Sequence, residues 1–224
     1  MKRKAITKAG IHIATTHTYT RQEELVNAIT HGFGALLSIA ALVLLIIFSS
    51  LYGTALHVVS FTIFGATMLL LYLASTLVHS FPEGKLKDLF EIFDHSSIYL
   101  FIAGTYTPVL LTVIRGATGW VLFGVVWGTA ALGLVFKAFL TKKFLFTSTL
   151  LYIAMGWLIV FAWRPLLLHA STDELVFLLV GGVLYTVGTV FYVWRGFKYH
   201  HAVWHLFVLG GSVFHFFAVL SIVM

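Results

Sequence analysis

The sequence predicts an all-α integral membrane protein, a bundle of seven transmembrane helices, and three observations support this fold class. Of the 224 residues, 60% are hydrophobic and only 10% are charged, whereas soluble domains average about 25% charged residues. The apolar residues form long uncharged runs close to the roughly 20 residues with which a helix crosses a bilayer. The Lys and Arg residues lie between these runs. We therefore expect the net charge of +6 to set membrane topology and not to bind nucleic acid.

We expect the chain to have two parts, a polar N-terminal tail over residues 1–24 and a single seven-helix domain over residues 25–224. The first apolar run begins near Leu25, too far into the chain and too long for a cleaved signal peptide. The expected spans are 25–49, 55–80, 90–113, 119–140, 144–163, 174–194 and 202–223.

The distribution of positive charge predicts the orientation of the bundle. In chain order, the tail and the segments after each span carry 5, 0, 2, 1, 3, 1, 2 and 0 Lys and Arg residues. Alternate segments therefore place 5 + 2 + 3 + 2 = 12 on one side and 0 + 1 + 1 + 0 = 2 on the other. By the positive-inside rule the N-terminus is cytoplasmic and the C-terminus is outside.

The chain contains no cysteine, so a transition-metal site would have to use histidine, carboxylate or water. The last span begins with the sequence HAVWH, which places His201 and His205 one turn apart on one helix face. This spacing suits the binding of one metal ion, and histidine within a membrane segment is costly without a partner. An HxxxH pattern is short, however, and needs support from other residues.

The predicted topology brings further polar residues to the same depth. The second span ends with Ser75 and His79, again four residues apart, at the cytoplasmic surface. The third span starts from that surface, and Asp94 lies about one turn inside it. The last span also starts there, so His201 and His205 share this level. Three helices thus place a serine, a carboxylate and three histidines in one leaflet.

In this order the residues resemble the hallmark motifs of the progestin and adipoQ receptor superfamily. The motifs are SxxxH at Ser75–His79, Asp94 within DHSSIYLFIAGTYTP, and HxxxH at His201–His205. The opening EELVNAITHGFG and the ending GGSVFHFFAV resemble its bacterial hemolysin III branch. The resemblance covers nearly the whole chain. It implies a seven-helix bundle with zinc held by three histidines, matched by His79, His201 and His205, and with Asp94 and Ser75 near the metal.

The resemblance and the residues together favour a zinc-dependent hydrolase. Some superfamily members and the related alkaline ceramidases are linked to lipid amide hydrolysis. Three imidazoles leave zinc an open fourth position, which is typical of catalytic sites, and zinc lowers the pKa of water to near 7. Asp94 would transfer protons, and Ser75 would donate to an oxyanion or orient a ligand. We expect a lipid amide or ester as substrate near the cytoplasmic leaflet of the cell membrane, and a role in lipid homeostasis.

Several alternatives stay open at this point. The zinc could be structural, tying three helices together in a lipid sensor or receptor. A pore is suggested only by the name of the hemolysin branch, because charge is nearly absent from the middle of the spans. Asp94 could cap the third helix or pair with Lys198, and Ser75 could bond the carbonyl four residues before it.

Other polar residues carry weaker expectations. His31 is either a hydrogen-bonding partner of the site or an interfacial histidine. His95 should point about 100° away from Asp94 and stay outside the metal-ligand set. His215 lies near mid-membrane and either forms a packing hydrogen bond or has a function of its own. Gly104 and Pro108 predict close packing and a local kink in the third span.

Overall fold

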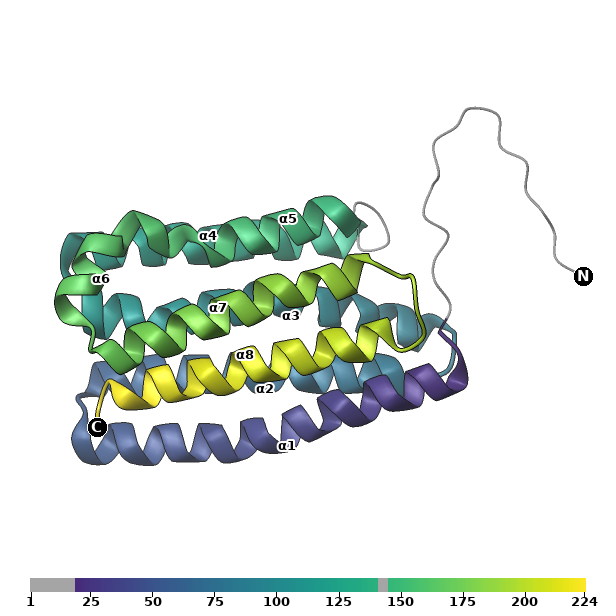
Figure 1. Cartoon of the computed structure of the whole chain (residues 1–224), viewed down its shortest axis with the longest axis horizontal. Coiled ribbons are helices and arrows are strands. Elements are labelled where there is room, and N and C mark those ends of the chain that lie inside the picture. The colour runs from purple at the N-terminus through teal and green to yellow at the C-terminus, as the bar shows by residue number, and fades with distance from the viewer. Residues whose placement is uncertain (1–18, 141–144) are drawn as a thin grey trace, which may run out of the picture.

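The computed structural model describes residues 19–140 and 145–224, and the ordered elements of these residues are helices (Figure 1). The elements are α1 (Arg21–Tyr52), α2 (Ala55–Ser80), α3 (Lys85–Pro108), the π-helical η1 (Val109–Ile114), α4 (Gly116–Leu140), α5 (Leu145–Gly156), the 3₁₀-helical η2 (Leu158–Ala162), α6 (Trp163–His169), α7 (Thr172–Val193) and α8 (His200–Ser221). They form seven stretches that are long and apolar enough to cross a membrane, which confirms the predicted fold class.

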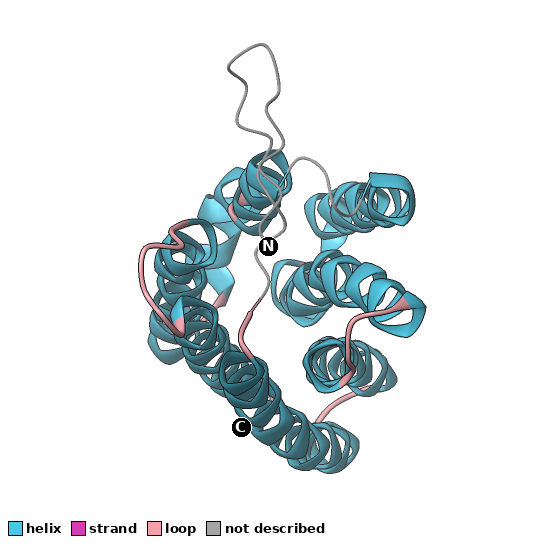
Figure 2. Cartoon of the chain, turned by 90° about the vertical axis from the view of Figure 1, so that its right-hand side faces the viewer, coloured by secondary structure: helices cyan, strands magenta, loops and turns pink. Residues whose placement is uncertain are grey.

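The helices run alongside one another and, seen end-on, enclose a common interior (Figure 2). α3 is the most buried helix of this bundle. Of its most apolar window, continued into η1, 83% of the residues are buried, whereas the other six spans bury between 17% and 50%. The outer helices therefore turn most of their apolar side chains toward lipid, as a bundle in a bilayer can do without cost.

α1 begins at Arg21, four residues before the predicted limit of the first span. The helix starts early because Thr20 forms a capping box with Glu23. The Thr20 hydroxyl accepts from the Glu23 backbone N–H at 3.3 Å, and the Glu23 carboxylate accepts from the Thr20 backbone N–H at 2.9 Å. The last residues assigned to the tail thus form the first turn of α1. The rest of that prediction, residues 1–18, lies outside the described residues, as do Lys142 and Lys143.

The third span is longer than predicted and changes its helical form after Pro108. It begins at Lys85 instead of residue 90, so Asp94 lies more than two turns inside it. Proline lacks the N–H that an α-helix needs at this position, and the chain continues as the π-helix η1. A local kink was predicted at Pro108, and what the structure shows there is this change of hydrogen-bonding pattern.

The fifth span was predicted to end at residue 163, but it continues to His169. Trp163, Arg164 and Pro165 looked like a span end, yet they form the first turn of α6, where proline is tolerated. The real break lies earlier, at Trp157 between α5 and η2.

A side chain from α3 satisfies the backbone at this break. The Tyr106 hydroxyl donates to the Gly156 carbonyl at 2.5 Å and accepts from the Ile159 N–H at 3.0 Å. Broken helices within a membrane need such partners because lipid offers none.

Candidate metal centre and adjoining cavity

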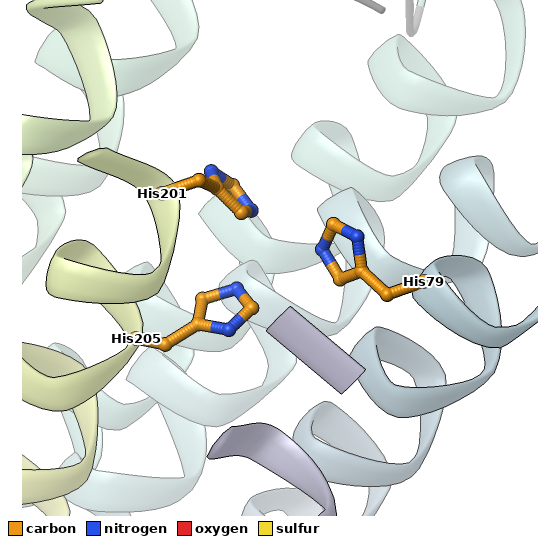
Figure 3. Close-up of side chains that lie close together, drawn as sticks. All are labelled: His79, His201 and His205. Atoms are coloured by element: carbon orange, nitrogen blue, oxygen red, sulfur yellow. The ribbon is translucent and has the colours of Figure 1, made fainter. Parts of the chain in front are cut away.

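His79 from α2 and His201 and His205 from α8 lie close together, with their rings turned toward one another (Figure 3). His79 is in the last turn of α2 and His201 in the first turn of α8, so the three residues lie near one end of the bundle. Each offers a ring nitrogen, and these three atoms lie within 4.8 Å of one another. All three side chains are buried. We call these residues the histidine cluster. The structure thus brings together the three residues that the sequence indicated as metal ligands.

The first turn of α1 orients His79. The His79 Nδ1 lies 2.6 Å from a Glu24 carboxylate oxygen, and a carboxylate accepts, so Nδ1 carries the hydrogen. The other Glu24 oxygen pairs with Lys87 at the start of α3. The Nε2 atom of His79 is buried and has no hydrogen-bond partner among the described residues. The lone pair of this Nε2 atom is therefore available to bind a cation within the cluster.

The second and third turns of α1 orient His205 in the same way. The His205 Nδ1 lies 3.0 Å from the Thr30 hydroxyl and 3.2 Å from the Asn27 carbonyl. The Thr30 hydroxyl already donates to backbone carbonyls, so it accepts from His205. The Nδ1 atom of His205 thus carries the hydrogen, and Nε2 is the nitrogen available to a metal.

Glu23 connects α1 to the start of α8. Its Oε1 accepts from the Tyr199 backbone N–H at 3.2 Å. Tyr199 precedes α8 with φ of 63°, a left-handed conformation that is costly for a residue with a side chain. The bond from Glu23 supports this conformation two residues before His201. Residues that were predicted to belong to a tail therefore hold in place the helix that carries His201 and His205.

His31 and Ser75 form a pair beside the cluster. The His31 Nδ1 lies 2.6 Å from the Ser75 hydroxyl, so Ser75 bonds another helix and not the carbonyl four residues before it. The His31 ring stacks on His205, with centroids 3.4 Å apart and an interplanar angle of 13°. The Tyr72 ring also packs against His31, perpendicular to it, with centroids 4.9 Å apart. His31 is thus buried against the cluster and is not an interfacial residue.

Tyr19, just outside the first span, covers the outer side of the cluster. Its ring centroid lies 5.2 Å from that of His201 and 6.0 Å from that of His79. Burial raises the pKa of Tyr19, so its phenol stays protonated at neutral pH. The cluster is therefore covered by a neutral aromatic ring.

The cluster adjoins a cavity of about 180 Å³ in the interior of the bundle. Ser75, Asp94, His201 and His205 line its near end. Within the described residues Asp94 forms no salt bridge with Lys198, which is exposed, and Asp94 is not among the clustered ligands. Most of the remaining lining is aliphatic or aromatic, from α3, α5, α7 and α8. Such a cavity suits a long apolar chain with a polar end group.

His95 lines the cavity but is not part of the histidine cluster. This agrees with the prediction that its side chain lies outside the metal-ligand set. Its Nδ1 donates to the Glu91 carbonyl at 2.7 Å, so Nε2 accepts from the Tyr192 hydroxyl at 3.1 Å.

The donors present suit zinc. Neutral imidazoles whose second nitrogen is hydrogen-bonded to a carboxylate or carbonyl are the usual environment of histidine ligands. His79 and His205 have this arrangement, and the Nδ1 of His201 is buried without a hydrogen-bond partner among the described residues. A cation at the cluster would satisfy buried nitrogens that otherwise cost free energy.

The model of a family described as "Haemolysin-III related" matches residues 19–216 of the chain. Two bacterial relatives are similar over almost their full length. A hemolysin-3 homolog of Bacillus subtilis (strain 168) is 55% identical over 202 residues, which are 90% of this chain and 95% of the relative. Hemolysin-3 of Bacillus cereus is 52% identical over 210 residues, 94% of this chain and 96% of the relative.

A more distant relative comes from an animal. The human monocyte to macrophage differentiation factor is 29% identical over 209 residues, 89% of this chain and 84% of its own length. No solved structure matches the chain significantly.

Proposed function

Because the chain belongs to the haemolysin-III-related family of membrane proteins, we propose that it is a zinc-dependent hydrolase acting on a lipid amide or ester. We place it in the cell membrane, with a role in lipid homeostasis. One observation carries the proposal. The buried histidine cluster adjoins a mostly apolar cavity, and the same end of that cavity is lined by Asp94 and Ser75. A metal that only tied helices together would need neither the cavity nor the carboxylate.

The proposed chemistry divides between the metal and the cavity residues. Zinc held by three imidazoles supplies a Lewis acid and a water whose pKa is near 7. The Asp94 carboxylate would take the proton lost by the water that attacks the carbonyl carbon. As the carbon–nitrogen or carbon–oxygen bond breaks, Asp94 would return that proton to the leaving atom. Asp94 would thus be restored to its starting state at the end of the reaction.

Ser75 would stabilise the oxygen of the substrate carbonyl, and His31 decides whether it can. If His31 carries its hydrogen on Nδ1, the Ser75 oxygen accepts from it and the serine hydrogen is free to donate to the substrate. The stacking of His31 on His205 holds this pair beside the cluster. His31 is therefore a positioning residue that acts through Ser75.

The cavity supports a lipid substrate over a pore. Apolar and aromatic side chains dominate its lining, whereas an ion pathway would need polar faces along several helices. The acyl chain would lie among α3, α5, α7 and α8, and its carbonyl would lie at the cluster. Water released from this apolar surface would supply most of the binding free energy.

The test compares purified wild-type protein with Asp94→Asn and with a variant lacking all three histidines. Asp94→Asn should retain zinc and the fold but lower turnover by about 10² to 10⁴, as loss of an acid–base group does. The measurement is fatty acid release from a panel of lipid amides and esters in nanodiscs, with metal content determined on the same samples. Zinc-loaded wild-type protein that releases no more than the triple variant across the panel would instead favour a lipid sensor.

We also propose that the cluster faces the cytoplasm, from the 12 to 2 distribution of Lys and Arg. A reporter fused after Met224 should be external, and one inserted at Lys142 should be internal. A cytoplasmic reporter at Met224 would move the site to the outer leaflet without changing its chemistry.

A further inference from the structure

The cavity extends beyond the cluster to a second polar group that the proposed hydrolysis does not use. His215 lines it on α8, ten residues after His205, which is about 15 Å farther along the helix. Tyr185 from α7 lines the same region, and its ring centroid lies 5.1 Å from that of His215. The His215 side chain is only 8% exposed. A polar side chain is therefore held deep in a mostly apolar cavity.

The His215 ring has a fixed orientation and a fixed tautomer. Its Nδ1 lies 2.9 Å from the Gly211 carbonyl, which can only accept, so Nδ1 carries the hydrogen. The ring lies against Gly181 of α7, where a Cβ atom would collide with Nδ1 and Cε1. No hydrogen bond of the described residues involves the Nε2 atom, and this atom is not among the fully buried unpaired nitrogens, so it keeps some access to the cavity. His215 thus presents an acceptor whose partner is missing.

The neighbouring hydroxyl groups do not supply that partner. Tyr72 donates to the Ser212 hydroxyl at 2.7 Å, and the Ser212 hydroxyl lies 3.0 Å from the Val208 carbonyl. The Tyr185 hydroxyl lies 3.0 Å from the same Ser212 oxygen, and either of these two groups can be the donor. Among the described residues neither phenol forms a hydrogen bond with His215. A donor for His215 has to come from the contents of the cavity.

We propose that His215 recognises a hydroxyl group on the chain of the bound lipid, at a distance from the group held at the histidine cluster. This inference rests on the proposed function only in that a lipid chain occupies the cavity. An unhydroxylated chain would leave a buried acceptor unpaired, and sites built for a hydrogen bond discriminate against ligands that lack it. The preferred substrates would then be lipids with a mid-chain hydroxyl group.

The test is the binding of 12-hydroxyoctadecanoate and octadecanoate to the purified full-length protein. Trp157, Trp163 and Trp204 line the cavity, so displacement of a brominated fatty acid that quenches their fluorescence reports affinity. Wild-type protein should bind the 12-hydroxy acid about 5- to 10-fold more tightly than octadecanoate, as one buried hydrogen bond provides. The isomer 2-hydroxyoctadecanoate, whose hydroxyl lies next to the carboxylate, should gain nothing from His215.

His215→Leu should abolish the preference for the 12-hydroxy acid, with zinc content as the check on folding. His169→Leu is the matched control, because His169 also lies 2.9 Å from a carbonyl four residues before it but is exposed on α6. His215→Gln keeps an acceptor and should keep part of the preference, which provides a test if the leucine variant does not fold.

Two results would overturn the inference while leaving hydrolysis open. One is equal affinity of the wild type for the three acids, and the other is a preference that survives in His215→Leu. Absence of binding by all three acids would also overturn it, and lipid turnover in the separate assay would show whether the hydrolase proposal still stands.

Discussion

Two residues of the histidine cluster, His201 and His205, lie on the same helix as His215, α8, yet the cluster and His215 are held in different ways. His205 bonds the Asn27 carbonyl and the Thr30 hydroxyl of α1, and His79 on α2 bonds Glu24 of α1. His215 instead donates to Gly211, four residues earlier in its own helix. The cluster therefore depends on contacts between helices, whereas the orientation of His215 depends on one helix and on the space left by Gly181.

This difference indicates which parts of the bundle control the histidine cluster and which control His215. The first three turns of α1 contribute no residue to the cluster, but they fix the tautomers of His79 and His205 and the start of α8. Changes there should reach the metal while leaving His215 unchanged. Changes at His215 should alter the cavity while leaving the metal in place.

The largest effect should follow from removing a ligand. His79→Ala, His201→Ala or His205→Ala should each lose most of the bound zinc, more than the roughly 100-fold loss of affinity that removal of a hydrogen-bonding partner causes. Thermal stability should fall with the metal, because binding favours the folded state. The measurements are metal content and a thermal unfolding curve. His169→Ala and His215→Ala should retain zinc, and a loss in either control equal to that in His205→Ala would contradict the comparison.

A smaller effect should follow from Glu24→Gln. The amide can accept from His79 but carries no charge, so zinc affinity should fall by about 10- to 100-fold. Glu83→Gln is the matched control, because Glu83 is also paired with Lys87, at 3.3 Å, and does not contact His79. Competition with a chelator gives both affinities. Similar values for the two variants would mean that Glu24 acts only through Lys87.

The smallest effects should come from two helix caps. Thr20 caps α1 beside the cluster, and Ser171 caps α7, whose N-terminus lies at the opposite end of the bundle (Figure 1). Replacement of either residue by alanine should lower the free energy of unfolding by about 1 kcal/mol. Only Thr20→Ala should also weaken zinc binding, since it loosens the turn that carries Glu23 and Glu24. A weakening of zinc binding by Ser171→Ala as well would show that the effect of a cap is not local.

Much of this arrangement could be predicted from the sequence. Long apolar runs indicated seven spans, and the positions of Ser75, Asp94 and the histidines within those runs placed them at one end of the bundle. The reason is that membrane helices have a fixed rise per residue, so sequence position converts directly into depth. The HxxxH spacing predicted that His201 and His205 lie on one helix face, and this prediction needs no information about other helices.

What could not be predicted depends on contacts between helices. Glu23 and Glu24 were assigned to a tail because they are charged and precede the first apolar run. The threonine and glutamate of the capping box, Thr20 and Glu23, were the available signal for an earlier helix start. Which helix face α1 turns toward α8 depends on packing, so the stacking of His31 on His205 was not predictable. The same holds for Tyr106, whose role exists only because the fifth span breaks opposite it.

The space that Gly181 leaves for the His215 ring has a consequence for how the sequence can vary. Gly181 and Gly182 are adjacent and identical, yet a side chain at Gly181 would collide with the imidazole, while a Cβ at Gly182 would meet no atom within 4 Å. In a library of single substitutions, alanine at residue 182 should be accepted and alanine at residue 181 selected against. A companion change at residue 215 to a smaller side chain should restore part of the tolerance at residue 181, because the Gly211 carbonyl oxygen, 3.1 Å from the added Cβ, would still be close. Substitutions at residues 181 and 215 should therefore be correlated, whereas substitutions at residue 182 should be independent of both.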